Sequence, residues 1–103
     1  MTFAPGNFKG DPEGHLTNQW GHFWIGYAGA AILAPHWGYP AAVIVALIYG
    51  FAWEGLVQRW VLPVDSFEDT LNVACGAVFA VSGSIPVLIA WAALLALGVW
   101  RRS

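Results

Sequence analysis

The chain has 103 residues, of which 58% are hydrophobic and only 10% are charged. Soluble domains carry about 25% charged residues, so this composition argues against a water-soluble domain and favours a protein embedded in lipid. The net charge of −2 offers no basic surface for nucleic acid. Cys75 is the only cysteine, which excludes an intrachain disulfide and a cysteine metal cluster within one copy.

The first nineteen residues form a polar leader, rich in glycine and proline, before the first apolar segment. They lack the basic start and apolar run of a cleavable signal, so the first hydrophobic segment is expected to remain as an anchor. Hydropathy predicts spans over about 20–37 and 39–61. Pro35, Gly38 and Pro40 separate them and favour a tight antiparallel hairpin.

The third apolar segment, about 70–100, is longer than one upright span of about 20 residues and shorter than two. Gly83 and Pro86 lie near its middle, where a proline removes a backbone donor. We predict one long helix, tilted or kinked at Gly83–Pro86, with a re-entrant hairpin as the alternative. The sequence therefore predicts an all-α membrane protein in which residues 20–103 form one bundle of three transmembrane helices.

Three spans would separate the charges of the chain. All the carboxylates, with Lys9 and Arg59, would lie on one side of the membrane, and Arg101 and Arg102 on the other. The basic residues divide evenly, so the adjacency of the arginine pair to a span decides the orientation. We predict a multi-pass protein of a bacterial inner membrane, with a cytoplasmic C-terminus and the acidic side outside.

Polar residues from all three predicted spans would converge on the acidic side. Their spacing of i, i+4 and i+7 puts those of each helix on one face. Oxygen ligands with one imidazole suit a divalent cation, and the same groups suit a polar headgroup or proton transfer. Helix capping also accounts for part of this pattern, but it does not explain Glu54. The candidate site residues are His22, Glu54, Gln58, Asp65, Asp69 and Asn72.

Small residues continue the polar faces toward the middle of each span. Gly26 and Ala30 follow His22, Gly50 precedes Glu54, and Gly76 and Ala80 follow Asn72 at intervals of four residues. Small residues at this spacing let membrane helices approach closely. The sequence predicts that Gly26, Ala30, Gly50, Gly76 and Ala80 pack helix against helix.

The run Glu54-Gly55-Leu56-Val57-Gln58, followed by 65–72 and Gly76, resembles the VanZ-like family of small membrane proteins. That family has an acidic residue near a Gln at the end of one helix, and an Asp-led stretch ending in Asn and Gly that opens the next. The Asp69-to-Gly76 interval agrees, whereas the Glu54-to-Gln58 interval is one residue longer and Asn72 comes one residue early. The chain also resembles small membrane proteins encoded by phages. These resemblances imply a helical membrane protein and no defined chemistry.

Three functions remain open at this point. The first is a membrane protein with an acidic site for a cation or polar headgroup, with or without catalysis. The second is a phage holin-like protein that forms pores or assembles in the membrane, its small residues serving a homo-oligomer. The third is an accessory subunit of a larger membrane complex, in which His22 or His36 holds a pigment or haem. No Ser–His or Cys–His nucleophile motif assigns a reaction.

Overall fold

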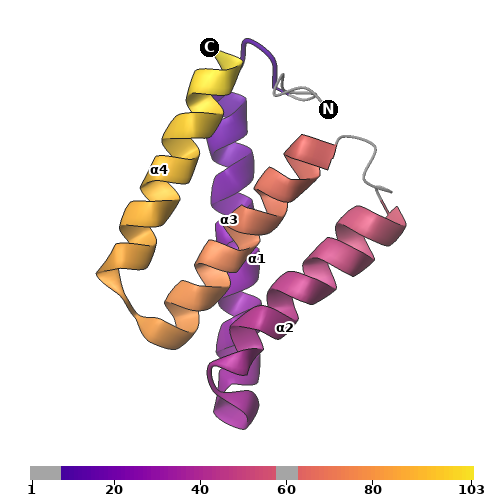
Figure 1. Cartoon of the computed structure of the whole chain (residues 1–103), viewed down its shortest axis with the longest axis vertical. Coiled ribbons are helices and arrows are strands. Elements are labelled where there is room, and N and C mark those ends of the chain that lie inside the picture. Colours follow the sequence, from indigo (N-terminus) through magenta and orange to yellow (C-terminus); the bar gives the residue numbers. More distant parts are fainter. Residues whose placement is uncertain (1–7, 58–62) are drawn as a thin grey trace.

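A computed structural model describes residues 8–57 and 63–103, which form four α-helices and no strand. The helices are α1 (Pro12–Trp37), α2 (Pro40–Ile48), α3 (Pro63–Ser82) and α4 (Ile85–Arg102), and α2 continues as the π-helix η1 (Tyr49–Val57). The all-α prediction is confirmed. Successive helices run in opposite directions, so the start of α1 and the end of α4 lie at the same end of the molecule (Figure 1). We call this the terminal end, and the opposite one the turn end.

The first helix begins within the predicted leader. Asp11 caps it, because its side chain accepts a hydrogen bond from the backbone N–H of Gly14 at 3.0 Å, and Pro12 occupies the first turn. Both are typical residues for a helix start. Helix α1 therefore starts before residue 20, where the membrane span is predicted to begin. The helical residues before it include His15 and Gln19, which are buried.

The predicted single helix over 70–100 is wrong, because the chain reverses within it. Gly83 has a φ of +60°, and its N–H donates to the carbonyl of Phe79 at 2.8 Å, which ends α3. Ser84 is extended, and Pro86 lies in the first turn of α4. A left-handed glycine followed by a proline is the ordinary end of one helix and start of another. The result is the α3–α4 hairpin seen in Figure 1.

The closest helix contact is the crossing of α1 and α3. A Cβ added at Gly26 would collide with the backbone carbonyl of Val73, and one added at Gly76 with the backbone carbonyl of Phe23. Backbones can approach this closely only where side chains are absent. Farther toward the turn end, Ala30, Ala42 and Ala77 form a small core, with Ala80 packed against it. Gly50 faces the side chain of Thr70 on α3.

Several charged side chains lie inside the bundle, and many large apolar side chains lie on its surface. Helix α3 packs against α1, α2, η1 and α4, and its acids are buried within the bundle. Large apolar side chains lie outside instead, including Ile32 at 71%, Phe51 at 73% and Trp100 at 71% exposed. Among the described helices, α4 alone is both long and apolar enough to cross a membrane, while 40–53 is a shorter apolar helix.

Candidate functional site: a charge cluster beside an amphipathic groove

A buried group of charges joins α3 to α4 at the terminal end. Arg102 Nη2 lies 2.8 Å from Glu68 Oε1 and 3.3 Å from Asp65 Oδ1. Arg101 Nη2 lies 3.4 Å from Asp65 Oδ1, and Arg101 Nη1 lies 3.3 Å from Glu68 Oε2. The prediction that the arginines lie opposite the acids is therefore wrong, because the α3–α4 hairpin returns the end of the chain to the acids.

Arg102 is the most extensively bonded member of this group. It is only 2% exposed, and its guanidinium donates to both oxygens of Glu68 and to the carbonyl of Gly98, the last at 3.1 Å. The backbone carbonyl of Arg102 also accepts from the N–H of Gly10 at 2.9 Å. The last turn of α4 is thus held to α3 and to the segment that precedes α1. Such bidentate, buried pairing suits the planar fork of arginine.

His15 of α1 completes the group, which we call the charge cluster: His15, Asp65, Glu68, Arg101 and Arg102. His15 is fully buried, with Nε2 3.9 Å from Glu68 Oε2. Within residues 8–57 and 63–103, neither of its ring nitrogens has a hydrogen-bond partner. Burial, and then the nearby Arg102 guanidinium, hold the pKa of His15 below its ordinary value of 6.5. The sequence interpretation left His15 outside the site, since it treated residues 1–19 as a leader.

A second polar layer lies below the charge cluster, between α1 and α3. Gln19 Nε2 donates to Asp69 Oδ1 at 2.6 Å, and His22 Nε2 lies 3.8 Å from Asp69 Oδ2. His22 Nδ1 lies 2.8 Å from the carbonyl oxygen of Asn18. A carbonyl oxygen can only accept a hydrogen bond, so Nδ1 carries the hydrogen and donates it. The ring of His22 also meets the ring of Tyr49 edge to face. The structure thus brings together His22 and Asp69 from the predicted site.

Asn72 occupies a structural position in the described bundle. It is fully buried, its amide donates to the carbonyl of Glu68, and its Oδ1 accepts from the indole N–H of Trp91 on α4 at 2.8 Å. The ring of Trp91 in turn stacks on Phe23 of α1, with centroids 3.9 Å apart. Asn72 therefore ties α3 to α4 and does not face a cavity.

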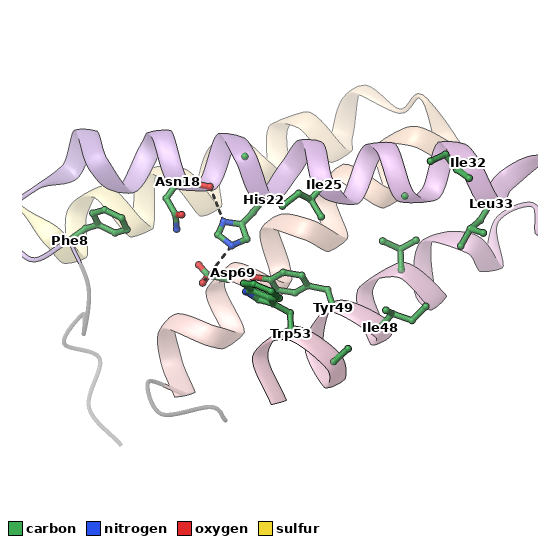
Figure 2. A pocket seen from close by; sticks show the side chains of 14 residues that line it. Phe8, Asn18, His22, Ile25, Ile32, Leu33, Ile48, Tyr49, Trp53 and Asp69 are labelled. Carbon is green, nitrogen blue, oxygen red and sulfur yellow. Dashed lines mark hydrogen bonds and ion pairs between the residues drawn. The ribbon is translucent and has the colours of Figure 1, made fainter. Parts of the chain in front are cut away.

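A groove with a volume of about 1060 Å³ runs between α1 and the continuous helix α2–η1. Figure 2 shows that His22 and Asp69 point toward each other at one end, close to Tyr49 and Trp53. Toward the turn end the wall is aliphatic, with Ile25, Ile32 and Leu33 from α1 facing Val45 and Ile48 from α2. The π-helical stretch supplies Tyr49, Ala52 and Trp53. The groove is therefore polar around Asn18, His22 and Asp69 and apolar from there toward the turn end.

The predicted site residues divide into three groups. His22 and Asp69 line the groove, whereas Asp65 belongs to the charge cluster. Glu54 lies in η1, but its side chain, like all of Gln58, falls outside the described residues. The described part of the chain holds no group of three His, Cys, Asp or Glu residues arranged to bind a metal ion. The structural residues that the sequence interpretation missed are His15, Gln19, Glu68, Arg101 and Arg102.

Helical spacing could have indicated some of the missed residues. His15, Gln19 and His22 are spaced i, i+4 and i+7, so they share one face of any helix that starts at Pro12. No sequence signal could have added the arginines, because their position depends on the reversal at Gly83.

No protein-family model, curated protein or solved structure matches this chain. The resemblance to the VanZ-like family and to phage-encoded membrane proteins therefore stays a prediction.

Proposed function

We propose that the chain is a multi-pass integral membrane protein that binds an amphiphile in the groove between α1 and α2–η1. The polar headgroup lies beside Asn18, His22 and Asp69, and the hydrocarbon chain follows the aliphatic wall. The observation that carries the proposal is the change from polar to apolar along a single groove. Small-molecule sites are typically apolar concavities with a few polar groups that fix orientation.

The surface of the bundle supports a membrane location. Large apolar side chains are exposed on α1, α2 and α4, while Asp65, Glu68, Arg101 and Arg102 are paired inside. In water this arrangement would leave extended apolar surface unburied, whereas lipid solvates it at no cost. Helix α4 is about 27 Å long at 1.5 Å per residue, close to the ~30 Å hydrocarbon core. The membrane-embedded part of α1 then begins near Trp20, and the charge cluster lies at headgroup level.

The dimensions of the groove match a lipid at this depth. His22 and Ile32 lie on α1, about 15 Å apart along its axis at 1.5 Å per residue. The polar end faces the headgroup level, and the aliphatic end lies toward the middle of the bilayer. A lipid that enters sideways from the membrane can therefore keep its headgroup hydrated while its chain replaces bulk lipid against the wall.

The inward pairing of the polar residues favours binding over pore formation. Gln19, Asp69 and Asn72 bond to other side chains within one copy of the chain. A pore would need such groups to face a water-filled path between copies, and it would first have to break these contacts. The described side chains thus support the amphiphile site more directly than the holin-like function.

Lipid retention by the purified protein tests the proposal. Gly21 lines the groove, and a Cβ added there meets nothing within 4 Å, so Gly21→Leu can start a side chain there without a clash and adds apolar volume to the groove. Ala93→Leu is the matched control, because it adds similar volume on the exposed face of α4. Each variant is reconstituted with phosphatidylethanolamine and phosphatidylglycerol, extracted into mild detergent and measured by native mass spectrometry. We expect wild type and Ala93→Leu to retain one lipid, and Gly21→Leu to lose about tenfold in occupancy.

His22→Gln tests the polar end separately. Loss of one hydrogen bond to a headgroup costs about 1 kcal/mol, so occupancy should fall about fivefold while the fold is retained. Equal lipid retention by wild type, Gly21→Leu and His22→Gln would contradict an amphiphile site in this groove.

A further inference from the structure

The charge cluster holds three helices together through groups whose charges balance only while His15 is neutral. From α3, Asp65 and Glu68 face His15, and from α4, Arg101 and Arg102 do so. On α1 itself, the backbone N–H of His15 bonds to the carbonyl of Asp11, and Gln19 follows one turn later. Two carboxylates thus face two guanidinium groups, and protonation of His15 gives these five residues a net charge of +1.

Packing prevents His15 from relieving that charge locally. A Cβ added at Gly98 would collide with His15 Nε2 and with Glu68, so the imidazole lies directly against the backbone of α4. Both oxygens of Glu68 already accept from Arg102. A protonated ring would therefore stand beside two arginines and out of reach of water, and the carboxylate oxygen that it faces, Glu68 Oε2 at 3.9 Å, already accepts from Arg102. An uncompensated buried charge of this kind costs several kcal/mol.

We propose that the charge cluster is a proton-sensitive clasp that holds the last turn of α4 against α1 and α3 and opens when His15 is protonated. Opening separates Arg101 and Arg102 from His15 and lets water reach the ring. The amphiphile groove lies on the α2–η1 side of α1, so the clasp does not rest on the proposed function.

The direction of the pH response follows from linkage. In the closed clasp the pKa of His15 is lowered by burial and then by Arg102, whereas in the open clasp it returns toward 6.5. Protons therefore bind the open form more tightly. The closed form keeps its full stability above pH 6.5. It loses stability as the pH falls below 6.5, until the lowered pKa is reached.

Hydrogen–deuterium exchange of the full-length protein in detergent tests the clasp. The backbone amides of residues 98–103 and 10–16 report on the two sides of the contact. After correction for intrinsic exchange, we expect protection there to fall between pH 7.5 and pH 5, by about tenfold for each pH unit below 6.5 until the lowered pKa is reached. In His15→Gln the protection should not depend on pH. His36→Gln, at the turn end, is the matched control and should behave as wild type.

Arg101→Gln distinguishes opening of the clasp from general unfolding in acid. It also provides the test if His15→Gln does not fold. It leaves the described cluster with an excess negative charge, which protonation of His15 neutralises. Acid should then increase protection of residues 98–103, the reverse of wild type. A pH-independent wild type, a response retained in His15→Gln, or a loss of protection in acid for Arg101→Gln would each overturn the proposal.

Discussion

Two glycines determine how closely α1 and α3 approach. Because glycine has no Cβ, Gly26 on α1 leaves room for the backbone of Val73 on α3. In the same way, Gly76 on α3 leaves room for the backbone of Phe23 on α1. In a bilayer, helix association depends on van der Waals packing, because lipid tails solvate apolar side chains as well as a neighbouring helix does. This crossing therefore carries much of the stability of the bundle, and it holds the polar layer of Gln19, His22 and Asp69 together.

Alanine at either glycine should separate the two helices. In Gly26→Ala and Gly76→Ala the added methyl group meets backbone atoms that cannot rotate away, so we expect a loss of about 3 kcal/mol or more in the free energy of unfolding. In Gly21→Ala the methyl group meets nothing, and the higher helix propensity of alanine should stabilise the protein by up to about 1 kcal/mol. Denaturant unfolding in mixed micelles, followed by circular dichroism, measures all three. Equal stability of Gly21→Ala and Gly26→Ala would contradict the close crossing.

At the scale of elements, the reversal at Gly83 decides the arrangement of the molecule. The apolar composition of residues 70–100 predicts one helix, and Pro86 is compatible with a kink in it. The left-handed φ of Gly83 and the extended Ser84 instead turn α4 back along α3. The α3–α4 hairpin then brings Trp91 to Asn72 and the arginines to Asp65 and Glu68.

Gly83→Ala distinguishes the hairpin from a continuous helix by the sign of its effect. In the hairpin, alanine must adopt a φ of +60°, which costs about 1–2 kcal/mol, and no new contact repays that cost. In a continuous helix, the same substitution would stabilise the protein by about 1 kcal/mol. Gly38→Ala, at the turn between α1 and α2, where φ is also positive, should destabilise as well. Unfolding in micelles gives the sign, and a stabilised Gly83→Ala would exclude the hairpin.

At the scale of the whole molecule, four helices that run in alternating directions put the described basic residues at one end. Lys9, Arg101 and Arg102 lie at the terminal end, and no Lys or Arg occurs between Gly10 and Gln58 or between Trp60 and Trp100. Arg59 belongs to the segment outside the described residues. In a membrane, an end with lysines and arginines favours the cytoplasm over an end with none. The cytoplasmic C-terminus therefore stays a prediction, and with it we now expect the acidic residues on the inside rather than the outside.

Reporter fusions test this orientation. With an even number of crossings, we expect a fluorescent protein that folds only in the cytoplasm to be active at either end of the chain. We expect alkaline phosphatase, which is active only outside, to work when inserted at Gly38. Three crossings would put the two ends on opposite sides, so activity of the same reporter at only one end would contradict the arrangement.

Several features of this protein follow from local sequence alone. The helical class and the turn between α1 and α2 follow from hydropathy and from Gly38 and Pro40, because both signals act over a few residues. The spacing of small residues predicts that Gly26 and Gly76 pack helix against helix, and the structure puts both at the α1–α3 crossing. Asp69 and His22 were grouped because each lies near the end of a predicted helix.

The tertiary structure decided which charges meet. Hydropathy cannot distinguish a kinked helix from a hairpin, because both contain the same apolar residues, and the difference depends on the backbone angle of one glycine. That angle decides whether Arg102 lies on the far side of the molecule or 2.8 Å from Glu68. His15 joins the charges only because α1 begins at Pro12 and α4 ends against it. The sequence alone thus determined where helices and turns form, whereas long-range packing determined the charge cluster and the groove.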